Sequence, residues 1–266
     1  MPILRDITLG QYYPGNSYLH RLDPRSKLIA SLIFMTSLLF AFNGKILLLN
    51  GLLCLIGISR SGVPARVVVR NVRPFLWLFV ITFLLHALST PGKILFAFPS
   101  VGFIVTQEGL LGGAAYVLRL TFLIVLAALF TLTTTPMDLT QGLSRLFRPL
   151  RWLKLPVHQF ALMMTLTLRF VPILLQEAQR IKNAQLSRGA ALDGKLLDRV
   201  KNLVPMLLPL FVSAIRRAED LATAMEARSY TQDGERTSFR RLGFTRNDFE
   251  LFGVIFVFLG VAGAVG

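Results

Sequence analysis

The sequence predicts an all-α integral membrane protein with about five transmembrane helices and long cytoplasmic helices before the last of them. Three observations support this. The 266 residues are 53% hydrophobic and only 16% charged. The apolar residues gather in long runs, as bilayer-crossing segments do, whereas a soluble domain of this length carries more charge. The formal net charge is +15, and the basic residues are interleaved with these runs, as in the cytoplasmic loops of membrane proteins.

Five apolar segments are the predicted transmembrane helices, and the first two form a hairpin. Asp23 is a good N-cap residue and Pro24 suits a first helical turn, so the first helix should begin there. Asn43-Gly44 marks the turn before the second helix, and Pro74 opens the third. Since a crossing normally takes about 20 residues, whether the first two helices both span fully stays open. The segments are 28–42, 46–58, 74–89, 108–133 and 249–265.

The distribution of Lys and Arg predicts the orientation in the membrane. Residues 1–27 and 59–74 carry four each and residues 136–247 carry eighteen, whereas the alternate loops carry one each, Lys45 and Lys93. Basic loops stay on the cytoplasmic side. We therefore expect the N-terminus and residues 136–247 in the cytoplasm, and the C-terminus outside.

The same pattern divides the chain into a membrane domain of about four helices (1–135), a cytoplasmic helical domain (136–247) and a C-terminal transmembrane helix (248–266). Two apolar stretches in the middle part, 155–175 and 203–215, complicate this division. Basic residues flank the first stretch on both sides, and the second is short and holds two prolines. We expect both to start long helices that lie against the membrane domain and end amphipathic in the cytoplasm. A re-entrant pair or two true crossings is the alternative.

A 40-residue internal repeat lies in this middle part. The repeated residues are Ala178, Ile181, Ala184 and Arg188 in the first copy, and Ala218, Leu221, Ala224 and Arg228 in the second. Steps of three, three and four place each set on one helical face, where small residues allow two helices to approach closely. Each set ends in an arginine, which could dock as a forked donor into acidic grooves on a pair of similar partner subunits. Alternatively, each arginine merely complements a helix dipole.

The sequence offers no catalytic, metal or cofactor site. Cys54 is the only cysteine, and the three histidines lie far apart. Gly189-x-x-x-x-Gly194-Lys195 looks like a phosphate loop, but Leu196 stands where Ser or Thr should hold Mg²⁺, and no strand precedes it. If the protein is driven by ATP, separate subunits must bind the ATP. The interleaving of basic residues with apolar runs argues against nucleic-acid binding, and no paired carboxylates or metal spacing supports an enzyme acting on lipid.

Several charged residues in apolar or helical surroundings need an interpretation. Carboxylates such as Glu177 lie at helical spacing among arginines and lysines, which favours ion-paired faces over catalysis. Arg119 stands inside an apolar run, where a charge is usually functional or paired with another buried group. A self-sufficient permease with a substrate path past Arg119 is therefore the alternative to a docking protein.

Three segments resemble the transmembrane T component of energy-coupling factor (ECF) transporters, the vitamin-uptake branch of the ABC transporters. The first runs from Gly10 to Gly15 and from Leu19 to Leu28, and contains Leu22, Asp23, Pro24 and Arg25. The second is Arg169-Phe170-Val171-Pro172 with Glu177 and Ala184-Gln185-x-Ser187-Arg188-Gly189, and the third runs from Ala224 to Tyr230. The family's short motif is Ala-Arg-Gly. It appears here as Ser187-Arg188-Gly189 and Ala227-Arg228-Ser229, so both arginines stand while one flanking residue differs in each copy.

The resemblance implies a multi-pass protein of a bacterial or archaeal cell membrane that hydrolyses nothing and needs no cofactor itself. It would sit on two ABC-type ATPase subunits through coupling helices, with each arginine motif in a groove on one ATPase. A membrane S component that binds a vitamin or metal would associate with the apolar faces of 155–175 and 203–215. ATP-driven movement of the coupling helices would make the S component topple and release its substrate inward.

Overall fold

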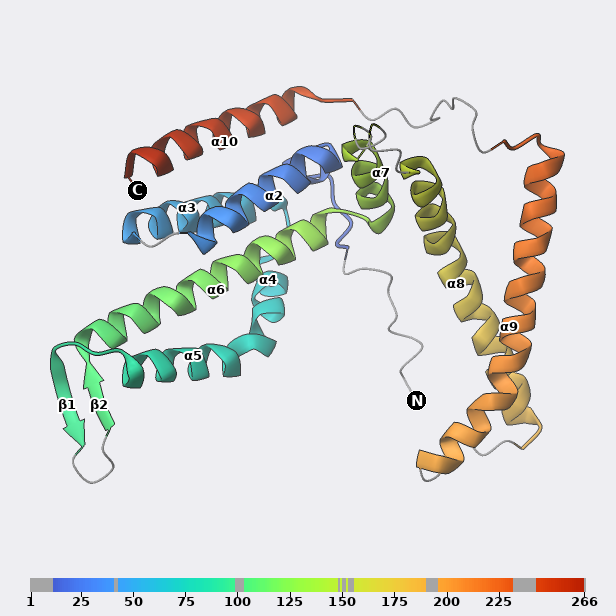
Figure 1. The fold of residues 1–266 in the computed structure, drawn as a ribbon, viewed down its shortest axis with the longest axis horizontal. Helices are drawn as coiled ribbons and strands as arrows, with labels where there is room; N and C mark the ends of the chain where they lie inside the picture. Colours follow the sequence, from blue (N-terminus) through green and yellow to red (C-terminus); the bar gives the residue numbers. More distant parts are fainter. Residues whose placement is uncertain are drawn as a thin grey trace. The chain divides into compact units, whose positions relative to one another are not determined.

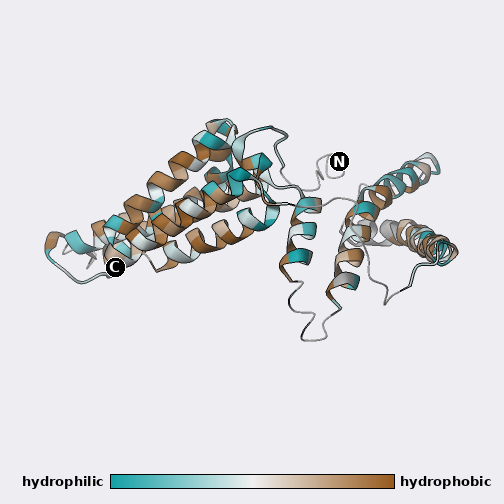
Figure 2. Ribbon diagram, turned by 90° about the horizontal axis from the view of Figure 1, so that it is seen from above, coloured by the Kyte–Doolittle hydropathy of each residue, from teal (hydrophilic) through white to brown (hydrophobic). Residues whose placement is uncertain are grey.

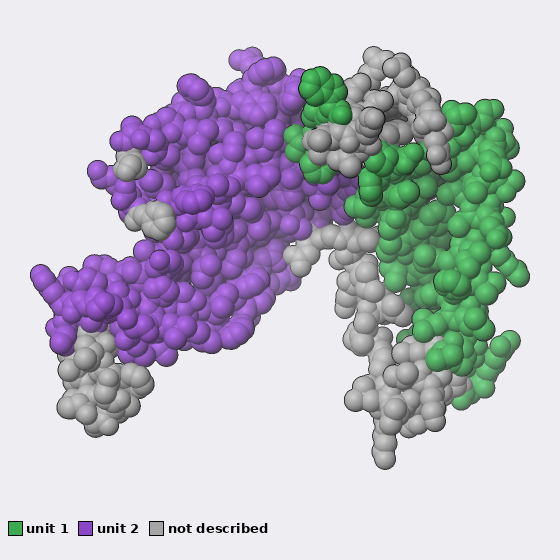
Figure 3. Space-filling view, in the orientation of Figure 1, with its two compact units in different colours: residues 1–9, 144–241 green, residues 10–143, 242–266 purple. Residues whose placement is uncertain are grey.

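The computed structural model describes residues 12–40, 43–98, 103–147, 149, 152, 156–189, 196–231 and 243–265. The chain forms two compact units, which are considered separately below (Figure 3). Unit 1 comprises residues 1–9 and 144–241, and unit 2 comprises residues 10–143 and 242–266. The predicted all-α fold is confirmed, and one short β-hairpin accompanies the helices.

Unit 2 is a helical bundle built around α6. Its longer helices are α2 (Pro24–Leu39), α3 (Gly44–Ser61), α5 (Leu76–Ser89), α6 (Gln107–Thr133) and α10 (Arg246–Val265). The shorter elements are α1 (Tyr18–Arg21), α4 (Ala65–Val72), a 3₁₀ turn (Arg73–Phe75) and α7 (Pro136–Leu146), which runs slightly past the boundary of the unit. The C-terminal helix α10 packs on α2, which lies near the start of the described chain (Figure 1).

Two segments that the sequence suggested as loops contain regular structure. Residues 59–74 include α4, whose Val68 is buried in a core cluster with Cys54 of α3 and Leu129 of α6. Valines on one face of this short segment thus gain a hydrophobic partner that composition alone does not reveal. Residues 90–107 include an antiparallel hairpin of β1 (Ile94–Phe98) and β2 (Phe103–Thr106).

Apolar side chains cover much of the outside of unit 2. Leu48, Trp77 and Phe256 expose 76%, 66% and 80% of their surface. In water such exposure would be costly, but in a bilayer these side chains face lipid. The hydropathy colouring shows the same hydrophobic character along the long helices of this unit (Figure 2). The buried core is correspondingly small, and α6 contributes to both of its clusters.

Five helices in the described part of the chain are long and apolar enough to cross a membrane, which agrees with the predicted number. Their membership differs from the sequence prediction. The segment Gln159–Ser187 of α8 qualifies, whereas α2 has only 16 residues and spans about 24 Å, less than the hydrocarbon core. The other four are Gly44–Ser61, Ala65–Ser89, Gln107–Thr133 and Arg246–Ala264.

Unit 1 is dominated by two long helices, α8 (Val157–Ser187, 31 residues) and α9 (Leu196–Ala227, 32 residues). Each continues through internal prolines, Pro172 in α8 and Pro205 and Pro209 in α9. The two helices pack against each other and cross, and their C-terminal ends point in opposite directions (Figure 1). Each helix is therefore a long arm, which ends in an exposed arginine at its C-terminal tip.

Candidate functional site

The C-terminal tip of α8 places Arg188 at the C-cap position, directly before a left-handed residue. Gly189 has φ 83°, and its backbone N–H donates to the carbonyl of Leu186 at 3.0 Å. Such a left-handed residue after the cap is how many helices end, and glycine adopts it without a Cβ clash. The helix therefore ends at Arg188.

The tip of α9 ends in the same way although it lacks the glycine. Ser229 has φ 56°, its N–H donates to the carbonyl of Glu226 at 2.8 Å, and the N–H of Tyr230 donates to the carbonyl of Met225 at 3.0 Å. These two bonds make a complete Schellman motif, with Arg228 at the C-cap. A serine in this conformation is strained, so the surroundings must hold it there.

Both tip arginines lie on the surface with their guanidinium groups available. Arg188 and Arg228 are exposed, and neither guanidinium pairs with another residue that the structure describes. Ser187, Gly189 and Ala227 beside them are exposed as well. A guanidinium on a rigid helix end can make bidentate bonds to a carboxylate, and the helix dipole there also favours a positive charge. The geometry suits docking of two tips into acidic surfaces.

The predicted packing stripe is only partly in use. Ala178, Ile181 and Leu221 are half-buried, but Ala184, Ala218 and Ala224 are exposed. The helices meet at a polar contact instead, because Arg217 of α9 donates to the Glu177 carboxylate of α8 at 3.1 Å. This confirms the interpretation of Glu177 as an ion-paired residue. The small residues nearest the tips, Ala184 and Ala224, are exposed among the described residues.

The N-terminal segment Leu22–Arg25 lies far from the tips in sequence and organises unit 2. The Asp23 carboxylate caps α2 by accepting from the Arg25 backbone N–H at 3.0 Å, as its N-cap character predicted. It also pairs with the Arg25 guanidinium at 3.1 Å. That guanidinium lies 4.7 Å from the centre of the Phe244 ring, and Leu22 is buried. These four residues therefore form a structural junction.

The partner of this junction is Asp248, which the sequence analysis missed. Its side chain is fully buried and accepts from the backbone N–H of Asp23 at 2.9 Å. Its other oxygen accepts from the N–H and the hydroxyl of Thr245, both at 2.7 Å, as in a capping box at the start of α10. A Thr-x-x-Asp pattern before an apolar run was the available local signal, although it could not reveal the contact with Asp23.

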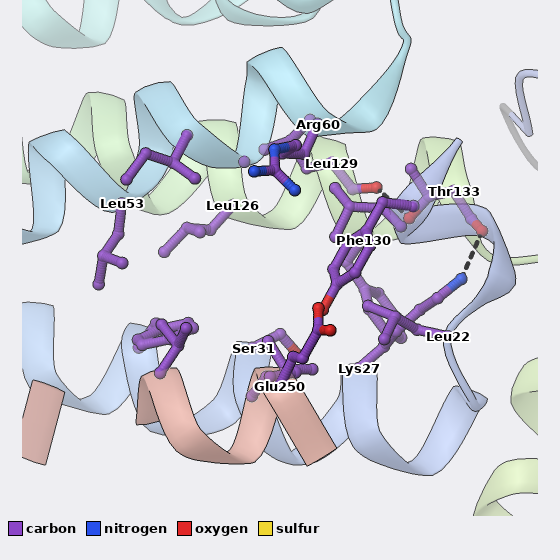
Figure 4. A pocket seen from close by; sticks show the side chains of 18 residues that line it. Leu22, Lys27, Ser31, Leu53, Arg60, Leu126, Leu129, Phe130, Thr133 and Glu250 are labelled. Atoms are coloured by element: carbon purple, nitrogen blue, oxygen red, sulfur yellow. Dashed lines mark hydrogen bonds between the residues drawn. The ribbon is translucent and has the colours of Figure 1, made fainter. Parts of the chain in front are cut away.

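A second buried contact holds the end of α6. The ammonium of Lys27 donates to the carbonyl of Thr133 at 2.9 Å, which satisfies a helix-end carbonyl (Figure 4). Both residues line an apolar cavity of about 330 Å³ between α2, α3, α6 and α10, with Arg60 and Glu250 near one end (Figure 4). Burial raises the pKa of Tyr18 on the same wall, so its hydroxyl stays protonated and donates to the Asn247 carbonyl at 2.8 Å.

Arg119 of α6 does not stand alone in the membrane span. Its guanidinium lies 4.9 Å from the centre of the Tyr116 ring, and that ring lies 4.2 Å from the ring of His86 on α5. A cation over an aromatic face is stabilised by the ring's quadrupole. The three side chains therefore form a stacked group between two neighbouring helices.

The described residues include no group of three or more His, Cys, Asp or Glu side chains that could hold a metal ion. What they offer is a set of apolar helices of membrane-spanning length and two long helices that each end at an exposed arginine, which is the architecture of a multi-pass membrane protein. The family described as cobalt transport protein (CbiQ) matches residues 15–239. The chain belongs to this family. Its curated relatives are named as transmembrane proteins of energy-coupling factor transporters.

Curated relatives agree along nearly the whole chain. The energy-coupling factor transporter transmembrane protein EcfT of Bacillus subtilis is 43% identical over 249 residues, which cover 92% of this chain and 93% of that protein. Proteins of the same name from Ruminiclostridium cellulolyticum and Heliobacterium modesticaldum are 41% and 45% identical. They cover 97% and 93% of this chain, and the matches cover 96% and 92% of those proteins. The resemblance inferred from the motifs is confirmed.

Proposed function

We propose that this ECF transmembrane component is a non-catalytic coupling subunit that transmits movement from two ABC-type ATPase subunits to a membrane S component. The observation that carries this proposal is the pair of helix tips. Arg188 and Arg228 both occupy C-cap positions directly before a left-handed residue, although Gly189 follows one and Ser229 the other. The same tip geometry on two repeated arms suits two similar partners, one for each arginine.

The apolar halves of α8 and α9 support a second interface, with a partner that lies in the membrane. Phe160 and Met163 of α8 expose about 60% of their surface, and Leu208 and Phe211 of α9 expose 67% and 63%. Neither set is covered by another described element of unit 1. Methionine and aromatic side chains adapt well to different partners. We assign these faces to the S component, whose own substrate would be a vitamin or another micronutrient.

The proposal also sets the location of each part. The N-terminus and residues 136–247 lie on the cytoplasmic side of a bacterial or archaeal cell membrane, because that side carries most of the Lys and Arg residues. The tip arginines are then within reach of soluble ATPase domains. Those partners bind and hydrolyse ATP. The S component binds the primary substrate.

The test is a charge reversal at the two tips. In the variant Arg188→Glu with Arg228→Glu, the chain is expected to stay in the membrane fraction and to lose both ATPases during affinity purification. A matched control is Lys182→Glu with Arg216→Glu, which makes the same change in net charge on the same two helices away from the tips. Retention of the ATPases by the tip variant, with normal uptake, would refute the coupling function.

A further inference from the structure

The contact between α8 and α9 joins two positions that are equivalent in the internal repeat. Glu177 and Arg217 are separated by 40 residues, and the repeat has the same offset. Equivalent residues of two repeated elements face each other only at an axis that exchanges those elements. The ion pair therefore marks the point about which the two helices are related by approximate two-fold symmetry.

The charged residues near this two-fold axis have opposite signs at equivalent positions. Identical charged residues that face each other at the axis would place like charges together, which is unfavourable. The sequence instead reverses the charge at equivalent positions. Glu177 is matched by Arg217, and one turn further on Arg180 is matched by Asp220. In the structure Arg180 also approaches the Glu177 carboxylate, at 3.9 Å.

The crossing divides the two helices into arms of equal length. Arg188 lies eleven residues after Glu177, and Arg228 lies eleven residues after Arg217. At 1.5 Å per residue, each tip is about 16 Å beyond the crossing. The C-terminal ends point in opposite directions from the crossing (Figure 1), so a change in the crossing angle moves both tips by the same amount.

The ion pair can keep the two helices in contact while the angle between them changes. The side chains of Glu177 and Arg217 keep 22% and 38% of their surface exposed, so water can reach them as the helices rotate. Arg217 has a further N–H, at Nε, that is buried and has no partner among the described residues. A polar contact of this kind keeps its partners through a change of angle, whereas interlocked apolar side chains resist sliding.

From these observations we infer that Glu177 and Arg217 are positioning residues that form the pivot of the two coupling arms. The pair keeps both arginine tips at equal distances from one axis, which is the axis that two like ATPase subunits would share. Their closure then changes the crossing angle at the pivot and carries the apolar halves of α8 and α9 with it. This inference deepens the proposed coupling function and rests on it.

The experiment measures the distance between the arms by spin labels. Asn183 and Thr223 are exposed, are again 40 residues apart, and lie between the pivot and the tips. Cysteines at these two positions, in a Cys54→Ala background, carry the labels. The chain is studied alone in detergent and in complex with its two ATPases, without nucleotide and with ATP. The test variant is Glu177→Gln with Arg217→Gln, and Glu219→Gln is the matched control.

In the unsubstituted pivot we expect one narrow distance in each nucleotide state and a shift of several ångströms between them. The Gln–Gln variant should at least double the width of the distribution and lose the discrete shift. Reversing all four charges, in Glu177→Arg, Arg180→Glu, Arg217→Glu and Asp220→Arg, should restore both properties. A Gln–Gln variant with the original widths and shift would overturn the pivot, and so would a four-charge variant that stays broad.

The measurements on the chain alone and on its complex with the ATPases separate this inference from the proposed function. Broadening in the chain alone depends only on the ion pair and needs no ATPase. If the ATPases do not bind the unsubstituted chain, the coupling function fails whatever the spin labels report. If they bind to the Gln–Gln variant but the nucleotide-dependent shift is lost, docking and pivoting are distinct, as inferred. If the Gln–Gln variant cannot bind ATPases, the pair is needed for docking and the pivot role is refuted.

Discussion

Asp248 at the start of α10 accepts a hydrogen bond from the backbone N–H of Asp23 at the start of α2, although 225 residues separate them. This contact ties the C-terminal helix to the N-terminal segment that the ECF family shares. It involves a fully buried carboxylate that also accepts two bonds from Thr245. The N-terminal segment therefore contributes to the folding of unit 2.

Replacing Asp248 should destabilise unit 2. Asp248→Ala leaves the buried N–H of Asp23 and the groups of Thr245 without their acceptor, which costs about 1–3 kcal/mol. The expected result is a lower thermal unfolding temperature of the detergent-solubilised protein. Glu250→Gln is the control, because Gln can still hydrogen-bond at this exposed position, and the lost ion pair with Arg246, at 3.9 Å between exposed side chains, contributes little. Equal unfolding temperatures for the Asp248→Ala variant and the control would contradict this role.

The serine at the tip of α9 offers an unusual gain in stability. Ser229→Gly should relieve the strain of its left-handed backbone, by about 1 kcal/mol, while keeping Arg228 in place. The opposite change, Gly189→Ala at the tip of α8, should cost a similar amount. Amide hydrogen exchange over residues 225–230 measures the first effect, with slower exchange expected in Ser229→Gly. Ser229→Ala serves as the control, and protection equal to that of Ser229→Gly would argue against strain.

Two glycines of α6 should respond in opposite ways to the same substitution. A Cβ at Gly109 would lie 2.8 Å from the carbonyl oxygen of His86 on α5, whereas a Cβ at Gly112 meets nothing within 4 Å. Gly109→Ala should therefore separate the helices and destabilise the protein by about 1–3 kcal/mol. Gly112→Ala should be neutral or stabilise the helix by up to about 1 kcal/mol. Unfolding midpoints measured in one detergent compare them, and the reverse order would show that α5 and α6 are packed differently.

The side of the membrane reached by each end of α8 separates the two interpretations of this helix. If α8 begins against the membrane domain and ends in the cytoplasm, cysteines at Trp152 and Asn183 should both resist a membrane-impermeant maleimide added to whole cells. A cysteine at Lys93 should react, since that loop is predicted to lie outside. Each is introduced singly after Cys54→Ala. Reaction at Trp152 or Asn183 would instead indicate a crossing, which the length and composition of α8 allow.

The sequence predicted the repeated helical faces of α8 and α9 better than the contacts within unit 2. The spacing of Ala178, Ile181, Ala184 and Arg188 predicted a helix there, and α8 confirms it, because helical periodicity is a local signal. The left-handed conformation of Ser229 was not predicted, since a serine rarely adopts it unless the surrounding structure holds it there. The stripe stays a prediction, since only Ala178, Ile181 and Leu221 of it are half-buried, and the Glu177–Arg217 pair adds a polar contact that was not predicted.

The contacts that were missed depend on residues far apart in the chain. Asp248 looks like an ordinary helix-start residue until its bond to Asp23 is seen, and α4 looks like a basic loop until Val68 meets α6. Single-sequence patterns report the period and ends of an element, but not its neighbour. The apolar composition had predicted α2 as a transmembrane helix and α8 as a cytoplasmic one. By length the two change places, since α2 has only 16 residues and α8 is long enough to cross a membrane.

The most direct test of the coupling account counts the ATPases bound to each chain by native mass spectrometry of the purified complex. The account predicts two ATPases on the unsubstituted chain, one on Arg188→Glu, one on Arg228→Glu and none on the double variant. The Lys182→Glu with Arg216→Glu control should keep both. Two ATPases on the double variant would contradict the claim that these two helix tips are the docking points.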